Sequence, residues 1–188
     1  MKKYGLLLIA LIIFVAGCEI KTVDEVKENT FALEYHLDFN HPYKYITPEE
    51  AIDFLQEGSG IIMFGFSSCP WCQSMVNILY EVAKDKNINE IYYLDIKKIR
   101  EQNTEEYQQI VNILNDYLYE DKDNNKRIYV PDIYFLNEGK ILGHDNDLSI
   151  LSGNVEEYIT KEKEKEIKEK LLNLIAKTFS GECIDCED

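Results

Sequence analysis

The sequence of 188 residues predicts an α/β domain with a central mixed β-sheet flanked by helices. Three observations predict this fold class. The continuous apolar run 61–66 is typical of a strand buried on both faces, as in a sheet that helices cover. Apolar residues then recur at helical spacing before a second strand-like run at 91–96. A turn signal at 137–140 separates two later strand-like segments, which predicts a hairpin and so an antiparallel part of the sheet.

Length and charge limit the function classes. At about 100–200 residues per domain, the length allows one globular domain with appendages. Asp and Glu number 35 against 20 Lys and Arg, which gives a formal net charge of −15. Nucleic-acid binding draws its affinity from basic residues, so we exclude nucleic acid as a partner. The same charge repels an anionic membrane surface, so membrane attachment needs another device.

The first 17 residues contain such a device. A basic start, Met1–Lys3, precedes an apolar run over 5–15 and small residues before Cys18. The run is shorter than the roughly 20 residues of a membrane-spanning helix. This pattern resembles a bacterial lipoprotein signal peptide, which implies that Cys18 becomes the lipid-modified first residue of the mature chain. An uncleaved N-terminal anchor is the alternative. Both place the domain on the extracytoplasmic face of the bacterial cell membrane, where disulfides persist.

The elements follow in order along the chain. Residues 18–43 are expected to be a tether with an edge strand, because apolar residues alternate over 31–39. A helix begins at Thr47, since Thr47, Pro48 and Glu50 form a helix-start pattern. After the strand 61–66, a helix carries the apolar positions Met75, Val76, Leu79, Val82 and Ala83. The remaining predictions are a strand over 91–96, a helix over 104–120, a proline-interrupted strand over 128–136, the hairpin turn and a final helix over 155–179.

The chemistry lies in the cysteines. Beside Cys18, four of the five form two C-x-x-C pairs, Cys69/Cys72 and Cys183/Cys186. Cys69 stands at the start of the predicted helix, where unpaired backbone N–H groups and the helix dipole stabilise a thiolate. Two intervening residues let Cys72 reach back across one turn. We therefore expect Cys69 to be the exposed attacking thiol and Cys72 the buried resolving thiol.

In chain order, the strand 61–66, the motif Cys69-Pro70-Trp71-Cys72, the pair Val130-Pro131 and the hairpin 137–140 resemble the thioredoxin superfamily. The resemblance covers residues 44–180 and implies a thioredoxin-like fold and a protein disulfide oxidoreductase without a cofactor. It implies a cis Pro131 that faces the disulfide, with Pro70, Trp71 and Val130 toward the substrate and Trp71 exposed. The chain is also similar to small extracytoplasmic thioredoxin-like proteins of the bacteriocin transport accessory type.

Two residues depart from the thioredoxin pattern. Thioredoxins carry a buried acid six residues before the first cysteine, where it assists proton removal from the resolving thiol; this chain has Met63. That role is vacant or belongs to another residue. Thioredoxins also have a helix-kinking proline at the position of Asn77, so we expect a straighter helix. Whether the protein oxidises, reduces or isomerises disulfides stays open.

Other uses of the cysteines remain alternatives. Cys69 and Cys72 could form a merely structural disulfide, or join Cys183 and Cys186 as a four-thiolate zinc site. A long apolar helix after the first pair, rather than a knuckle turn, argues against zinc, and we expect no metal. In the acidic tail 181–188, neighbouring carboxylates oppose thiolate formation. Both a secondary redox role for the tail pair and a static disulfide or free thiols stay open.

The expected function is thiol–disulfide exchange with protein thiols or disulfides outside the cytoplasm, by a monomer attached to the membrane through a lipid on Cys18. The rival, from a different class, is a non-catalytic lipoprotein that uses the fold as a binding or accessory module. The two hypotheses differ in whether the chemistry of Cys69 is needed.

Overall fold

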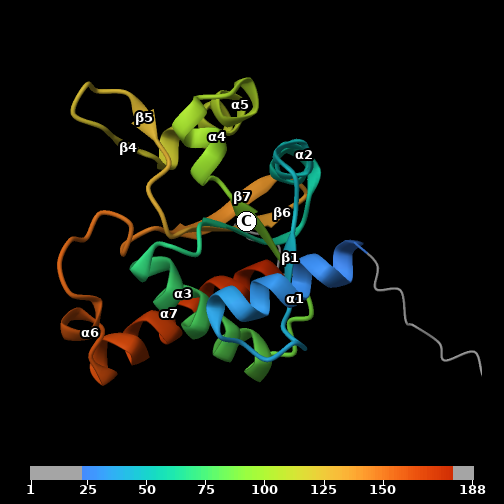
Figure 1. The fold of residues 1–188 in the computed structure, drawn as a ribbon, viewed down its shortest axis with the longest axis vertical. Helices are drawn as coiled ribbons and strands as arrows, with labels where there is room; N and C mark the ends of the chain where they lie inside the picture. The colour runs from blue at the N-terminus through green and yellow to red at the C-terminus, as the bar shows by residue number, and fades with distance from the viewer. Residues whose placement is uncertain (1–22, 180–188) are drawn as a thin grey trace, which may run out of the picture.

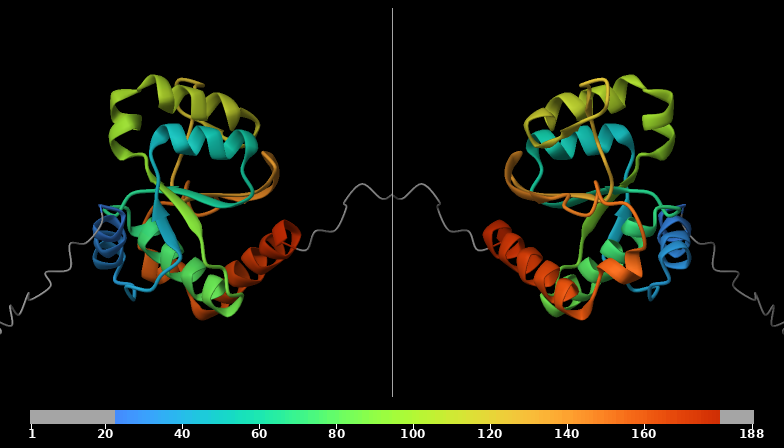
Figure 2. Two further views of the ribbon diagram at one scale, coloured as in Figure 1. Left: turned by 90° about the vertical axis from the view of Figure 1, so that its right-hand side faces the viewer. Right: turned by 90° about the vertical axis from the view of Figure 1, so that its left-hand side faces the viewer.

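The computed structural model describes residues 23–179, and in it a five-stranded sheet runs between two layers of helices (Figures 1 and 2). The strand order is β1-β3-β2-β6-β7. β3 is parallel to both β1 and β2, whereas β6 is antiparallel to β2 and β7 to β6. This is the thioredoxin-like α/β fold with a mixed sheet that the sequence predicts. The strands are β1 (Tyr43–Tyr45), β2 (Gly60–Gly65), β3 (Ile91–Asp95), β6 (Asp132–Asn137) and β7 (Lys140–Asp145), with β4 (Tyr119–Glu120) and β5 (Lys126–Arg127) in a separate ribbon.

Helices cover both faces of the sheet. Figure 2 shows α1, α3 and α7 on one side and α2, α4 and α5 on the other. α3 crosses over from β2 to β3 and makes this strand pair parallel. The helices are α1 (Val23–Tyr35), α2 (Pro48–Glu57), α3 (Pro70–Asp85), α4 (Lys97–Gln102), α5 (Glu105–Ile113), α6 (Val155–Tyr158) and α7 (Lys161–Phe179), with a 3₁₀ turn at Asn115–Tyr117.

Local sequence signals explain the elements that frame the site. At the start of α2, Thr47 Oγ1 accepts a hydrogen bond from the Glu50 N–H (3.2 Å), and the Glu50 carboxylate accepts one from the Thr47 N–H (2.7 Å). This capping box confirms the predicted helix start. All of β2 is buried, as predicted for a strand between two layers. The hairpin turn also forms, with Glu138 and Gly139 both at positive φ (49° and 74°).

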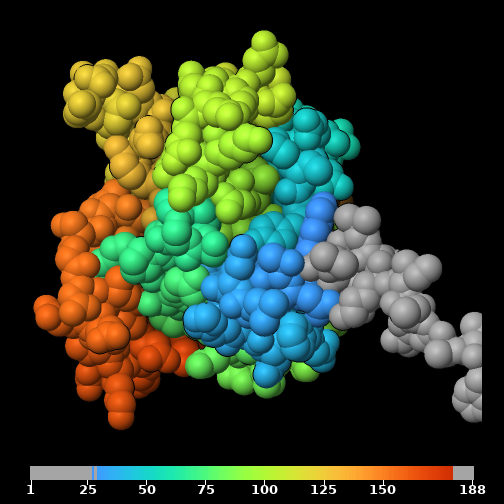
Figure 3. Space-filling model, in the orientation of Figure 1, coloured from blue at the N-terminus to red at the C-terminus, as the bar shows by residue number. Residues whose placement is uncertain are grey.

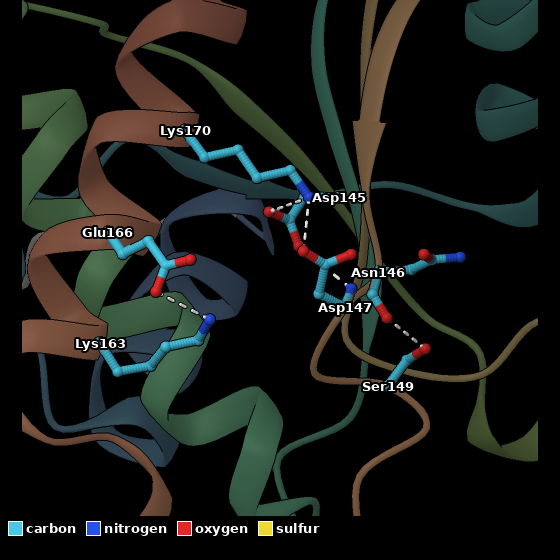
Figure 4. A network of polar contacts seen from close by, with 7 residues as sticks. All are labelled: Asp145, Asn146, Asp147, Ser149, Lys163, Glu166 and Lys170. Carbon is cyan, nitrogen blue, oxygen red and sulfur yellow. Dashed lines mark hydrogen bonds and ion pairs between the residues drawn. The ribbon is translucent and has the colours of Figure 1, made fainter.

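Ion pairs fix α7 to the end of β7 (Figure 4). Lys170 Nζ lies 3.1 Å from a carboxylate oxygen of the buried Asp145 and 2.8 Å from one of Asp147. Along α7, Lys163 pairs with Glu166 at 3.0 Å. A charge buried this deeply requires a partner, so Lys170 satisfies Asp145 and holds the helix against the sheet.

The N-terminal segment differs from the prediction. The expected strand over 31–39 is wrong, because α1 covers residues 23–35 and the edge strand is β1. Phe31 and Tyr35 are fully buried, whereas Leu33 between them is 67% exposed. The apolar residues at 31 and 35 therefore share one helix face at a spacing of four. The segment predicted as a tether contains a helix that packs against β1 and α3.

Two predicted helices are also shorter in the structure. The helix expected over 104–120 ends at Ile113, and the helix expected over 155–179 is interrupted between α6 and α7. At that break, Thr160 Oγ1 accepts a hydrogen bond from the Lys163 N–H (3.2 Å), so Thr160 caps the N-terminus of α7. Between residues 23 and 179, none of the helices combines the length and apolar character needed to cross a membrane.

Candidate functional site

Cys69 and Cys72 meet where β2 gives way to α3. Cys69 is the N-cap residue of α3, and Pro70 takes the first helical position, where a missing N–H costs nothing. The Cys69 Sγ accepts a hydrogen bond from the Cys72 N–H at 3.2 Å. A sulfur thus occupies the place where a cap oxygen normally satisfies the free N–H groups of a helix start.

This position lowers the pKa of Cys69 to about 7. The largest cause is the hydrogen bond from the Cys72 thiol, with further help from the backbone N–H groups of Cys72 and Trp71 and from the positive charge of Arg100. Burial acts in the opposite direction but is outweighed. Near neutral pH a large fraction of Cys69 is therefore thiolate, the nucleophilic form of cysteine.

Cys72 is in the opposite state. Its side chain has no exposed surface, against 7% for Cys69. Burial, and then the neighbouring Cys69, raise the pKa of Cys72 far above its ordinary value. The pair therefore combines a thiol with a lowered pKa and a thiol with a raised pKa. The expectation that Cys69 is exposed is wrong, because Cys69 is buried as well as Cys72.

The loop before β6 completes one side of the site. The Val130–Pro131 peptide bond is cis, as the resemblance implied. The Val130 carbonyl oxygen lies 3.9 Å from the Cys69 Sγ, so the two sequence-distant motifs lie side by side. Among the predicted substrate-facing residues, the structure therefore brings Val130 and Pro131 together with the cysteine motif.

Trp71 differs from the prediction. We expected it to be exposed, but only 8% of its surface is accessible. Its ring packs edge-to-face against Tyr158 of α6, with the ring centroids 5.6 Å apart. Burial against a segment far along the chain explains the error, because nothing within the motif itself predicts that α6 covers the tryptophan.

Arg100, on α4, is a site residue that sequence reasoning missed. Its guanidinium group lies over the Phe66 ring at 5.1 Å and donates from Nη1 to the Ile128 carbonyl oxygen at 3.2 Å. Its charge lowers the pKa of both cysteines. Its buried Nε has no hydrogen-bond partner among residues 23–179. A basic residue soon after β3 in an acidic chain is the only sequence signal that could have found it.

The acid missing at Met63 is not supplied by the buried Asp132. Asp132 pairs with Phe64 across the antiparallel strands β6 and β2, one residue along from Met63 and so on the other face of the sheet. Its pKa is raised well above the ordinary value by burial and by Asp145, while a hydrogen bond from the Tyr134 hydroxyl (3.0 Å) opposes the shift. Asp132 therefore lies on the sheet face of Phe64 and Tyr134, opposite to Asp145, which is the register partner of Ile133.

Three predicted residues, Cys18, Cys183 and Cys186, lie outside the described residues. Within 23–179, no group of three or more His, Cys, Asp or Glu side chains is arranged to hold a metal ion.

No protein-family model and no curated protein matches the chain. Among solved structures, it is similar to two thioredoxins of Arabidopsis thaliana in the oxidised state. Thioredoxin O2 shares 16% identity over 70% of this chain and 96% of that chain, with a TM-score of 0.39. Thioredoxin O1 shares 18% identity over 69% of this chain and 96% of that chain, with a TM-score of 0.38.

Proposed function

We propose that this protein exchanges thiols and disulfides with protein substrates outside the cytoplasm through Cys69 and Cys72. The observation that carries the proposal is the Cys69 sulfur that caps α3, 3.2 Å from the Cys72 N–H and with a pKa of about 7. A merely structural disulfide needs no such thiolate. A perturbed pKa at a specific charged and hydrogen-bonded site is typical of a reactive group.

The geometry supports a two-step exchange. In the reducing direction, the Cys69 thiolate attacks a substrate disulfide, which forms a Cys69–substrate disulfide and releases one substrate sulfur as a thiol after it takes up a proton. Cys72 then loses its proton and attacks the Cys69 sulfur. The Cys69–Cys72 disulfide forms, the substrate leaves as its second thiol, and two electrons have passed to the substrate. Oxidation of a substrate dithiol is the same sequence in reverse.

The loop at Val130 and Pro131 is the proposed substrate platform. The backbone carbonyl of Val130 lies next to the attacking sulfur. At this loop, an extended substrate segment can pair with the protein backbone. Pro70 is the first residue of α3 and directly follows the attacking cysteine. Trp71 contributes only its small exposed edge, because most of its ring packs on Tyr158.

Trapping the intermediate tests the proposal. In Cys72→Ala the second step is blocked, so mixed disulfides with substrate proteins should accumulate on Cys69 and disappear on reduction. They can be isolated from cells and identified by mass spectrometry. Cys69→Ser combined with Cys72→Ala is the matched control and should trap nothing. If Cys69→Ser matches the wild type in disulfide exchange on a model protein, the non-catalytic binding module is the better hypothesis.

The compartment is a second part of the proposal. We place the domain on the extracytoplasmic face of the bacterial cell membrane, held by a lipid on Cys18, from the resemblance of residues 1–18 to a lipoprotein signal. In intact cells, a membrane-impermeant thiol reagent should then label Cys69. Cys18→Ala should abolish incorporation of a labelled fatty acid. Absence of labelling in intact cells, with labelling after lysis, would contradict the placement.

A further inference from the structure

The proposed function requires the buried Cys72 thiol to lose its proton, and the groups described so far do not explain how the resulting thiolate is stabilised. To resolve a mixed disulfide, Cys72 has to pass through its thiolate form, which burial disfavours. Met63, on the neighbouring strand, carries no polar group to help it. A polar group that acts on the Cys72 sulfur from the core side therefore has to come from another residue.

Two buried tyrosines meet this requirement. The Tyr35 hydroxyl of α1 is hydrogen-bonded to the Tyr93 hydroxyl of β3. Tyr93 is the register partner of Met63 across the parallel pair β2–β3, so it occupies the sheet position beside the missing acid. Both hydroxyl groups lie within electrostatic reach of the Cys72 sulfur.

The backbone of β2 connects the tyrosine pair to the sulfur. A Cβ added at Gly65 would lie only 2.9 Å from the Tyr93 hydroxyl, so this glycine leaves the space that the hydroxyl fills. The next residue, Phe66, has its backbone N–H directed at the Cys72 sulfur, where it favours the thiolate. The end of β2 thus borders the Tyr93 hydroxyl at Gly65 and the Cys72 sulfur at Phe66.

α1 is held where it can supply Tyr35. From α3, the Gln73 side-chain amide donates to the Glu34 carbonyl oxygen (2.9 Å) and the Asn77 amide donates to the Tyr35 carbonyl oxygen (3.3 Å). Asn77 is the position that departs from the thioredoxin pattern, and here it binds α1. Figure 3 shows α1 lying on the molecular surface directly alongside the segment that contains α3.

We propose that the Tyr35–Tyr93 hydroxyl pair is the polar group that stabilises the Cys72 thiolate during resolution, and that α1 is part of the active site because it supplies Tyr35. The hydrogen bond between the two hydroxyls uses one of their two hydrogens. The dipole of the remaining hydroxyl acts on a developing thiolate through space, within a buried region where electrostatic interactions are strong. This role rests on the proposed function, and within it the tyrosines position charge rather than touch the substrate.

The pair stays uncharged over the whole working pH range. Burial raises the pKa of both tyrosines far above the ordinary value, so neither ionises. In the resolving step, the Cys72 sulfur attacks the Cys69 sulfur, the Cys69–Cys72 bond forms and the Cys69–substrate bond breaks. The proton lost by Cys72 is taken up by the departing substrate sulfur. The tyrosines keep their protons throughout.

Other charged or titratable groups border the same region and belong in any pH analysis. Arg100 of α4 acts on both cysteines. The carboxyl of Asp95 on β3 has a raised pKa, mainly through burial, and interacts with Tyr35 and Tyr45. The Tyr45 hydroxyl donates to the Glu34 carboxylate at 2.7 Å. Tyr35→Phe and Tyr93→Phe leave all of these charged and titratable side chains in place.

The test uses the reduced protein with Cys18, Cys183 and Cys186 replaced by Ser, so that only Cys69 and Cys72 react. The reagent is dithionitrobenzoate, an aromatic disulfide that releases a coloured thiol. Cys69 releases the first equivalent by attack, and Cys72 releases the second by resolving the mixed disulfide, so the two steps appear as two kinetic phases. Tyr35→Phe and Tyr93→Phe should each slow the second phase by about three- to tenfold, the range for the loss of one ordinary polar interaction, and shift its pH profile upward. The first phase should keep its rate.

Tyr43→Phe is the matched control, because Tyr43 is equally buried and its hydroxyl donates to the Val76 carbonyl oxygen of α3 at 2.8 Å. It should lower stability while leaving the second phase unchanged. The inference is overturned if both tested variants keep the wild-type second phase, or if Tyr43→Phe slows that phase equally. Absence of the first phase in the wild type would instead refute the proposed function. Either tested variant alone decides the matter if the other fails to fold.

Discussion

At the scale of residues, two identical side chains three positions apart acquire opposite acid–base properties. The Cys69 sulfur occupies the cap of α3 and receives hydrogen bonds, whereas Cys72 lies inside the first turn with no exposed surface. The pKa of Cys69 is lowered and that of Cys72 is raised for these reasons. In the proposed exchange, this difference makes Cys69 the first sulfur to attack, because the thiolate fraction decides which sulfur reacts first.

The reactivity of Cys69 should follow this pKa. Alkylation by iodoacetamide in the reduced protein should rise through pH about 7 and level off above it, because only the thiolate reacts. Cys72→Ala removes the thiol that contributes most to the lowered pKa, so the rise should move to higher pH. An unchanged profile in Cys72→Ala would show that the helix N–H groups and Arg100 alone set the pKa.

At the scale of elements, what the sequence could predict depended on how local the signal was. The capping box at Thr47, the buried strand β2 and the turn at Gly139 are each specified by neighbouring residues, and all three formed as predicted. α1 was missed because Phe31 and Tyr35 satisfy both strand alternation and a helical spacing of four, and only burial against β1 and α3 decides between them. Trp71 and Arg100 could not be placed because their partners, Tyr158 and Ile128, are distant in sequence.

α1 should behave as part of the core rather than as a tether. Phe31 is fully buried and its ring stacks on those of Tyr35 and Tyr43 at 4.5 and 4.6 Å. Phe31→Ala should therefore lower the free energy of unfolding by about 3–5 kcal/mol. Leu33→Ala, on the exposed face of the same helix, should change it by less than about 0.5 kcal/mol. Urea denaturation measures both, and equal values for the two variants would mean that α1 is not docked in solution.

At the scale of the whole molecule, the thiolate at Cys69 couples folding to the redox state. In the reduced protein the folded state lowers the pKa of Cys69 from the ordinary 9.0 to about 7. Between these values the unfolded chain binds more protons than the folded one, so the free energy of unfolding rises with pH and the gain is lost as pH falls through 7. Cys72 adds nothing below pH 9, because its raised pKa keeps it protonated in both states.

The oxidised protein has no thiol at Cys69 or Cys72 and therefore lacks this contribution. We expect the free energy of unfolding of the reduced form, relative to the oxidised form, to increase from pH 6 to pH 8, as about 7 lies between them. Urea denaturation of both forms at the two pH values measures the difference, in which all other titrating groups largely cancel. Reduced Cys69→Ser should lose the increase. Whatever stabilises the reduced form makes the disulfide a stronger oxidant. The same experiment therefore indicates that the oxidising power of Cys69 and Cys72, relative to a dithiol of ordinary pKa, grows with pH over this range. A constant difference would mean that the fold does not favour the Cys69 thiolate.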